Sequence, residues 1–292
     1  MHNKFKIKAG ELVSLNKEET TGSQHFFANE DEAKKILAED VNKMEQLQQK
    51  FYASGKKAIL IIFQGMDTAG KDSCIRHIFS GVNPQGCTVT SFKQPTSLEL
   101  SHDFMWRHYA TLPSKGFISI FNRSYYENVL ITRIHPDLLL KELLPGIKTA
   151  TDITNHFWKN RFDTINAFEK QLAASGTVIL KFFLHISKQE QKNRLLQRIV
   201  DKDKNWKFEY GDLSERAYWY QYKKAYEDML SNTSTHDAHW YVIPADEKWF
   251  SRVAISRILV KNMEDMEFSY PALTNDKMQL LAKAAIELKD EN

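Results

Sequence analysis

Residues 58–73 read AILIIFQGMDTAGKDS, an unbroken apolar run followed by a short loop with a glycine at each end. The apolar run, 58–63, is rich in branched side chains and is typical of a strand that is buried on both faces of a parallel sheet. The loop from Gly65 to Lys71 matches the pattern G-x-x-x-x-G-K, and a helical pattern follows it. Strand, loop, lysine and helix in this order predict a phosphate-binding P-loop, with a plain glycine turn as the alternative.

Each residue type in this loop has a task in holding a phosphate. The glycines let the backbone turn tightly, so that its N–H groups point at phosphate oxygens beside a helix N-terminus. Lys71 is expected to bridge the transferred phosphoryl group. Asp72 stands where a magnesium-binding Ser or Thr is usual, so we expect Asp67 to supply the carboxylate for Mg²⁺ or Mn²⁺. The expected phosphate-contacting set is Gly65, Met66, Thr68, Ala69, Gly70, Asp72 and Ser73.

Outside the loop, strand and helix patterns alternate. Short apolar runs occur at 88–92, 117–121, 178–184 and 241–243, and helical patterns occur near 30–53, 97–111, 124–143, 155–174 and 247–266. This alternation predicts a parallel sheet with helices on both faces. We therefore expect an α/β, P-loop kinase-like three-layer sandwich with a five-stranded parallel sheet. Asn29, with Glu32 three residues later, is expected to cap the first helix.

Three parts of the chain are expected from these patterns. They are an N-terminal arm (1–30), a P-loop kinase domain (31–270) and a C-terminal helical tail (271–292). Inside the domain, residues 187–231 are expected to form an inserted helical lid, with helices near 188–200 and 213–230. A further amphipathic helix is expected at 277–289.

Polar residues follow the apolar run at 117–121. Asn122 stands where P-loop enzymes place a magnesium-holding Asp, and Arg123 beside it can contact phosphate. Glu127 and Arg133 follow on a predicted helix. The alternative for Arg123 and Glu127 is a surface pair four residues apart.

The expected lid is rich in basic side chains. Arg194 and Arg198 are four residues apart and share a helix face, which suits a lid that closes on phosphates; a solvated basic face is the alternative. Further lid lysines are Lys192, Lys202, Lys204 and Lys207, and further candidates for a polyanion track are Lys93, Arg107 and Lys115. The aromatic residues Trp206, Phe208 and Tyr210 could stack on a base, although core packing is the more ordinary role.

Composition restricts the class of protein. The chain has 292 residues, 42% of them hydrophobic and 26% charged, as in a folded domain. Its 40 basic and 37 acidic residues nearly balance, and no apolar run approaches the length of a membrane helix. Its two cysteines, Cys74 and Cys87, have no metal-type spacing. We expect a cytoplasmic protein, with neither a nucleic acid nor a membrane as partner.

Several ordered motifs resemble the polyphosphate kinase 2 family over about residues 30–270. They are GMDTAGKD (65–72), SGVNPQG (80–86), SFK (91–93), FNRSYYE (121–127), KFFLHIS (181–187) and ERAYW (215–219). The resemblance implies a P-loop fold with a helical lid, magnesium, and polyphosphate as donor or acceptor. Asn122 and Glu127 resemble the class III pattern, where other classes carry Asp and Asn, and class III implies that both AMP and ADP are accepted.

The resemblance also assigns roles to the residues that match. Asp67 organises magnesium and phosphate, and Lys71 binds the transferred phosphoryl group. Arg123, Arg194 and Arg198 neutralise its charge, and Lys93 and Arg133 are secondary candidates for binding phosphate or nucleotide. Lys207, one of the lid lysines, is a further candidate on its charge alone. No nucleophilic side chain is needed, because phosphoryl transfer rests on positioning and charge stabilisation. Expected partners are inorganic polyphosphate, adenine or guanine nucleotides, and further copies of the chain in a homodimer or homotetramer.

Two other functions fit the same P-loop. A nucleoside monophosphate kinase would share the loop, sheet and lid but use ATP as donor. A regulatory P-loop protein would bind a nucleotide or polyphosphate without turnover, and the replacement of Ser or Thr by Asp72 keeps that alternative open.

Overall fold

Strand β1 (Ala58–Gly65) is the centre of the molecule, and all eight of its residues are buried. The computed structural model describes residues 3–22, 26–27 and 29–291. Its parallel five-stranded sheet has the order β2-β3-β1-β4-β5. The other strands are β2 (Cys87–Ser91), β3 (Ile118–Asn122), β4 (Thr177–His185) and β5 (Trp240–Pro244). The expected α/β sandwich with a five-stranded parallel sheet is confirmed.

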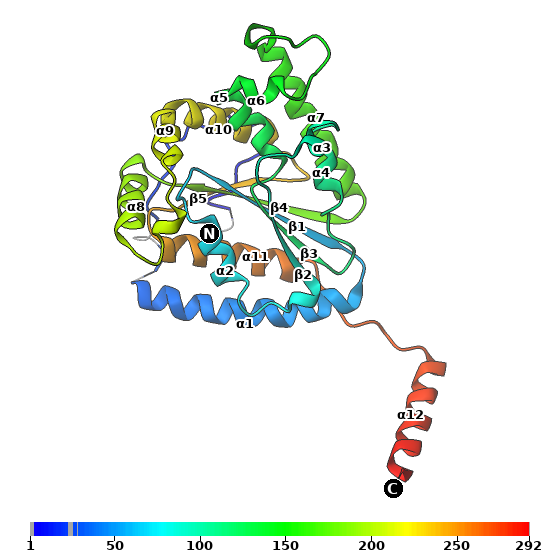
Figure 1. Cartoon of the computed structure of the whole chain (residues 1–292). Helices are drawn as coiled ribbons and strands as arrows, with labels where there is room; N and C mark the ends of the chain where they lie inside the picture. Colours follow the sequence, from blue (N-terminus) through cyan, green and yellow to red (C-terminus); the bar gives the residue numbers. More distant parts are fainter. Residues whose placement is uncertain (1–2, 23–25, 28, 292) are drawn as a thin grey trace.

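Helices cover both faces of the sheet (Figure 1). On one face lie α1 (Glu30–Ser54), α2 (Lys71–Ile78) and α11 (Lys248–Asp265); on the other lie α7 (Asn155–Ala174) and α10 (Trp219–Thr233). Apolar residues fix both layers: Phe51 of α1 on one face and Ile165 of α7 on the other are fully buried. The expected cap of α1 is present, because the Asn29 side chain accepts a 2.9 Å hydrogen bond from the Glu32 N–H.

Two expected helices are interrupted, and both predictions of a continuous helix were wrong. The segment 97–111 holds two single turns, α3 (Ser97–Leu100) and α4 (Trp106–Tyr109), and 124–143 holds η3 (Tyr125–Val129), α5 (Ile131–Ile134) and α6 (Pro136–Leu140). Asp103 accepts a hydrogen bond from the Met105 N–H and so starts a new turn. Pro136 lacks an N–H and cannot continue α5. These breaks turn the chain around a cavity at the carboxyl edge of the sheet.

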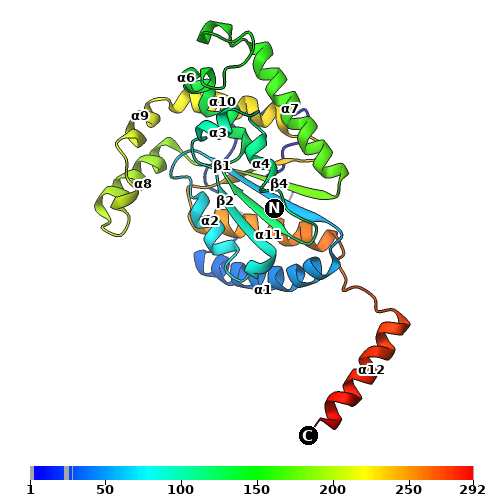
Figure 2. The ribbon, with the colours of Figure 1, turned by 45° about the vertical axis from the view of Figure 1, so that its right-hand side comes forward.

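The expected lid hairpin divides into two parts. Helix α8 (Lys188–Val200), the turn η5 (Asn205–Lys207) and α9 (Gly211–Ala217) project from one side of the body (Figure 2). By contrast, α10 buries Tyr226, Met229 and Leu230. The second helix that we expected in the lid is therefore part of the core from Trp219 onward.

The two ends of the chain differ in how they meet this core: Phe5 and Ile7 near the N-terminus are buried in it, whereas the C-terminal helix is not. Near the N-terminus, Lys6 forms an antiparallel bridge with Tyr241, and the Ile7 N–H donates to the Trp240 carbonyl at 2.9 Å, so the arm lies along β5. At the other end, α12 (Asn275–Asp290) stands away from the body and has no buried residue (Figures 1 and 2). Two further 3-10 turns are η2 (Pro84–Gly86) and η4 (Ala150–Asp152). Among the described residues, no helix is both long and apolar enough to span a bilayer.

Candidate active site

The P-loop joins β1 to α2 at the carboxyl edge of the sheet. A Cβ at Gly65 would lie 2.9 Å from the Leu184 carbonyl oxygen, so only glycine lets β1 pass β4 at this point. Thr68 has a φ of +63° and Gly70 a φ of +107°, both in the left-handed region. A non-glycine residue in that region is strained, and such strain is held in place only by its surroundings. The loop is therefore a preformed, constrained turn.

Lys71 is buried inside this turn. Its ammonium group donates to the carbonyl oxygens of Gly65 (2.7 Å) and Met66 (3.3 Å). Burial, together with the nearby Arg123 charge, lowers the pKa of Lys71 to about 8, and Asp67 is the strongest of the carboxylates that oppose these effects. The ammonium group thus lies within the cradle and would gain a counter-charge from a bound phosphate.

Arg123 and Asp67 form an ion pair at the mouth of the loop, with Nη2 and Oδ1 3.1 Å apart and both side chains more than a third exposed. Arg123 has a φ of +65°, and its N–H donates to the Phe63 carbonyl at 3.1 Å. The end of β3 is thereby held against the end of β1. The interpretation of Arg123 as a mere surface partner of Glu127 does not fit, because Arg123 faces the P-loop.

Asn122 and Glu127 flank this ion pair. The Asn122 side chain donates to Asp72 Oδ1 at 2.6 Å and so joins the end of β3 to the start of α2. Glu127 is partly buried, and burial raises its pKa, while the Arg123 and Lys71 charges oppose the rise. The Gln64 amide, oriented with its nitrogen toward Glu127 Oε1 at 3.0 Å, supports the carboxylate. Both residues therefore lie beside the loop, as expected.

The carboxylates at the mouth of the loop fit Mg²⁺. Mg²⁺ is usually held by one or two carboxylates together with waters and phosphate oxygens of the substrate. Asp67 and Asp72 supply such groups at the loop, and neither is fully buried. Within the described residues, no three His, Cys, Asp or Glu side chains converge into a metal cage. The donor set therefore suits an ion that also binds the phosphates.

Arg194 has a different position from the one we expected. It was predicted to lie on a mobile lid face, but its side chain is 5% exposed and paired with Glu190. Its Nη1 donates to the carbonyls of Thr68 (2.9 Å) and Ala69 (3.0 Å), and its Nη2 donates to those of Ala245 and Asp246. All five N–H groups of the guanidinium are thus engaged. Arg194 supports the P-loop from outside and is not free to swing over the phosphates.

Arg198, by contrast, belongs to the lid itself. It donates to Asp212 Oδ2 at 3.0 Å and to the Lys207 carbonyl at 3.4 Å. Burial and the nearby Asp67 carboxylate raise the pKa of Asp212, while Arg198 opposes the rise. Lys207 is exposed, with its ammonium group 5.0 Å from the Trp206 ring centre.

Two other predicted residues are bonded to distant helices, and a third lies at the opposite edge of the sheet. Ser73 accepts a 2.7 Å hydrogen bond from Arg252 of α11. Arg133 pairs with Asp228 at 3.0 Å and lies over the Trp158 ring. Lys115 precedes β3 and so lies at the amino edge of the parallel sheet, opposite the P-loop. Lys115 therefore does not converge with Lys93 and Arg107, which line a cavity at the carboxyl edge.

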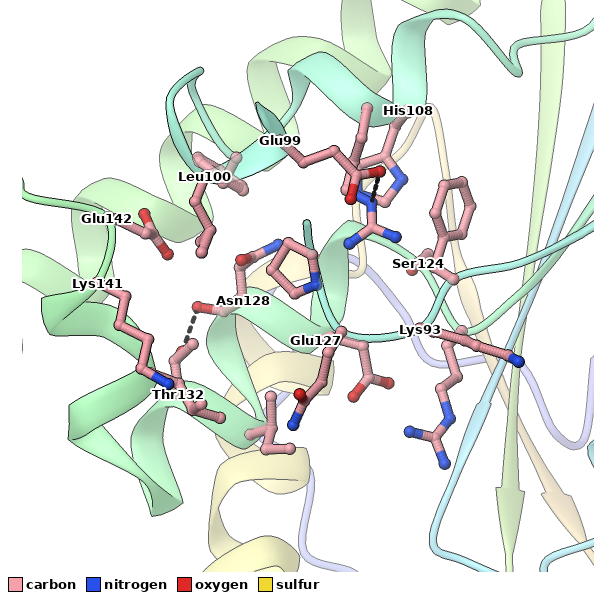
Figure 3. Close-up of a pocket in the computed structure, with 18 of the residues that line it drawn as sticks. Lys93, Glu99, Leu100, His108, Ser124, Glu127, Asn128, Thr132, Lys141 and Glu142 are labelled. Atoms are coloured by element: carbon pink, nitrogen blue, oxygen red, sulfur yellow. Dashed lines mark hydrogen bonds and ion pairs between the residues drawn. The ribbon is translucent and has the colours of Figure 1, made fainter. Parts of the chain in front are cut away.

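A cavity of about 150 Å³ opens next to Arg123 (Figure 3). Lys93 and Arg107, both predicted as candidates, line it, as does Glu127. Figure 3 shows Glu127 on η3 between Lys93 on one side and Lys141 on the other. Arg107 pairs with Glu99 at 3.2 Å. The cavity thus has charged side chains on both sides of Glu127, with apolar residues such as Phe92, Phe104 and Leu138 between them.

Some site residues escaped the sequence reasoning. Gln191 is buried, and its amide donates to the Asp67 carbonyl at 3.2 Å. Its spacing of three residues before Arg194 could have placed it on the same helix face. Core packing, which we preferred for the lid aromatics, was wrong for Trp206 and Tyr210, because they are 74% and 80% exposed.

Comparison with known proteins shows what the chain resembles. A family model described as Polyphosphate kinase 2 matches residues 27–271. The chain is 47% identical over 270 residues to an ADP-polyphosphate phosphotransferase of Rhodopseudomonas palustris, with 92% of each chain covered. It is 40% identical to an AMP/ADP-polyphosphate phosphotransferase of Meiothermus ruber, covering 92% of this chain and 95% of the relative. The crystal structure of polyphosphate kinase 2 from Arthrobacter aurescens TC1 superimposes with a TM-score of 0.87 at 35% identity, covering 98% of this chain and 96% of that one.

Proposed function

The chain belongs to the polyphosphate kinase 2 family, and on this premise we propose that it transfers a phosphoryl group from inorganic polyphosphate to both AMP and ADP. It is a polyphosphate-driven nucleotide phosphotransferase. The observation that carries the proposal is the P-loop cradle, where Lys71, Asp67 and Arg123 meet at the edge of a cavity. The relatives' names differ on AMP, so acceptance of AMP is the finer part of the proposal.

In the proposed reaction, an oxygen of the acceptor's terminal phosphate attacks the terminal phosphorus of polyphosphate. The new P–O bond forms as the P–O bond to the shortened chain breaks, and the reverse reaction lengthens the chain. Lys71 and Arg123 stabilise the charge on the transferred group, and the loop N–H groups orient it. Arg198 of the lid adds charge when it exchanges Asp212 for phosphate.

Magnesium is the proposed cofactor, and Mn²⁺ could replace it. Asp67 and Asp72 would hold the ion, since these carboxylates stand at the loop and Asn122 orients the second one. When bound, the ion neutralises phosphate charge and fixes the phosphates relative to each other.

The cavity beside Arg123 is the proposed site for the acceptor nucleotide. Lys93 and Arg123 line it and can bind the acceptor phosphate, while Phe92 and Phe104 supply apolar surface for the base. Adenine is the proposed base, with guanine nucleotides as the alternative acceptors. Glu127 lies at the same site, where a carboxylate can influence which acceptor phosphate is accommodated.

A donor and acceptor panel tests the function. Polyphosphate or ATP is offered as donor to AMP, ADP, GMP and GDP, with Mg²⁺ present. Polyphosphate alone should convert AMP to ADP and ADP to ATP. If only ATP serves as donor, the nucleoside monophosphate kinase alternative is correct. Lys71→Ala should lower turnover by about two to three orders of magnitude, whereas a non-catalytic nucleotide-binding protein has no turnover to lose.

The choice between AMP and ADP is proposed to depend on Asn122 and Glu127. The double variant Asn122→Asp, Glu127→Asn moves the carboxylate from η3 to the end of β3, beside Asp72. It should therefore change the ratio of kcat/KM for AMP to kcat/KM for ADP. An unchanged ratio in an active variant would remove these two residues from the explanation of acceptor choice.

We also propose a homodimer or homotetramer in the cytoplasm. The apolar residues of α12 support self-association, because Leu280, Ile286 and Leu288 are each more than 60% exposed. Both cysteines, Cys74 and Cys87, are free thiols, which fits a reducing compartment.

A further inference from the structure

Besides Arg194, a second side chain of α8 contacts the P-loop, the buried Gln191. Gln191 of α8 donates to the Asp67 carbonyl at 3.2 Å, and its side-chain oxygen accepts from Arg216 Nη1 at 2.7 Å. The same Arg216 nitrogen donates to the Lys188 carbonyl at 2.8 Å. Hydrogen bonds that involve a charged group are stronger than neutral ones. Arg216 of α9 is therefore joined to the backbone of the residue that carries the loop carboxylate.

The residue before Arg216 connects the lid to the other half of the site. The Glu215 carboxylate lies 2.9 Å from His135 Nε2 and accepts from the Tyr222 hydroxyl at 2.7 Å. His135 stands between α5 and α6, and both helices contribute to the wall of the acceptor cavity, with Thr132 before it and Leu138 after it. Two successive side chains thus contact two different supports of the site: Arg216 contacts Gln191 beside the P-loop, and Glu215 contacts His135 between α5 and α6.

These two residues stand at the base of the lid. Helix α9 has no buried residue, whereas α10, which starts at Trp219, buries that residue at once. The helices are separated at Tyr218, whose ring packs edge-on against His135 at 5.1 Å. The junction between α9 and the core therefore lies next to Glu215 and Arg216.

We propose that Arg216 and Glu215 are positioning residues that couple the lid to the two halves of the site separately. Arg216 acts through Gln191 on the P-loop and hence on polyphosphate. Glu215 acts through His135 on the α5–α6 wall and hence on the acceptor nucleotide. This inference rests on the proposed function, because it assigns the loop to polyphosphate and the cavity to the acceptor.

The test measures KM for polyphosphate and KM for ADP in two single variants. Arg216→Met keeps the aliphatic stem and removes the hydrogen bonds, and it should raise KM for polyphosphate about tenfold with KM for ADP changed less than about twofold. Glu215→Gln should raise KM for ADP about tenfold and change KM for polyphosphate less than about twofold. Arg216→Lys, which retains one donor, should recover part of the polyphosphate affinity.

Gln191→Met removes the hydrogen bonds of Gln191 to the Asp67 carbonyl and to Arg216. This variant replaces Arg216→Met in the test if Arg216→Met does not fold. It should raise KM for polyphosphate to a similar extent, and the double variant Gln191→Met, Arg216→Met should be no worse than either single variant. The matched control is Gln197→Met, since Gln197 is an exposed glutamine of the same helix. The control should leave both KM values unchanged.

Other outcomes overturn the inference. An equal rise of both KM values in each variant, or additive effects in the double variant, would mean that the two residues only stabilise the lid. The unmodified enzyme in the same assay reports on the proposed function. If it shows no turnover with polyphosphate and ADP, the function itself is wrong; if it turns over but the KM values do not separate, only the coupling is wrong.

Discussion

Lys71 and Arg194 show how the surroundings of a cationic side chain decide its task. Both are buried next to the P-loop and both bind its carbonyl oxygens. Lys71 has a single terminal nitrogen and a depressed pKa, so a phosphate that replaces its carbonyl partners improves its electrostatic environment. Arg194 has every N–H engaged, and phosphate could recruit it only by dismantling the loop. Lys71 is therefore suited to bind phosphate, and Arg194 is suited to hold the shape of the P-loop.

The titration of Lys71 should appear in the pH dependence of polyphosphate use. Only the protonated amine attracts phosphate, and the pKa of about 8 means that the free enzyme loses this charge as pH rises through 8. The kcat/KM for polyphosphate should be level below pH 8 and fall by about tenfold per unit well above it. In Lys71→Arg, whose guanidinium stays charged, the remaining activity should show no such fall. The same fall in Lys71→Arg would assign it to another group.

Arg194→Lys and Arg198→Lys should have different effects. An ammonium group cannot satisfy five acceptors in a planar fork, so Arg194→Lys should lower the free energy of unfolding by about 1–3 kcal/mol. Arg198 is partly exposed on the lid, so its replacement should leave unfolding unchanged and weaken polyphosphate binding. Chemical denaturation measures the free energy of unfolding of the two variants, and KM for polyphosphate reports on binding. Equal stability of the two variants would contradict the structural role of Arg194.

The turn η3 is held in place by a buried ionic network under the site. Lys181 of β4 donates to Glu169 Oε2 of α7 at 2.6 Å, and both side chains are fully buried. The hydroxyls of Tyr125 and Tyr126, on η3, each donate to Glu169 Oε1 at 2.7 Å. A strand, a helix and the turn that carries Glu127 are thereby joined. Breaking such a pair on one side leaves an uncompensated buried charge.

Lys181→Met should therefore destabilise the fold strongly. The Glu169 carboxylate would remain buried without its ammonium partner, which should cost about 3–5 kcal/mol of unfolding free energy. Urea denaturation measures the change, and Lys170→Met, at an exposed lysine of the same helix α7, is the control. A loss below about 1 kcal/mol for Lys181→Met would show that the network contributes little.

The whole molecule consists of a rigid core with two parts that project from it. The lid, α8 to α9, is connected to the core by polar side chains, and its outer surface exposes Val200 and Trp206. Helix α12 has no buried residue. Most of a helix's stability in a protein comes from packing of its apolar face, and no residue of α12 is buried against the rest of the chain. A second copy of the chain is the partner that we propose.

Removal of residues 271–292 tests that role. Since α12 contributes nothing to the core, the truncated chain should keep its far-UV circular dichroism apart from the loss of one helix. Its mass in solution, by light scattering, should fall by at least half relative to the full chain if α12 holds the oligomer together. If the truncated chain has the same number of subunits as the full chain, the subunit interface lies on another surface.

The local sequence was sufficient for the sheet, the P-loop and the cap at Asn29, because periodicity, glycine spacing and capping are properties of neighbouring residues. It also placed Asp67, Lys71 and Arg123 together, since parallel strands end at one edge. It did not separate Arg194 from Arg198, assign α10 to the core, or reveal Gln191 and the Lys181–Glu169 pair. Each of these features depends on contacts between residues that are distant in the sequence. Only the folded chain brings the hydrogen-bond partners of the buried polar groups, and the apolar surface that covers α10, next to them.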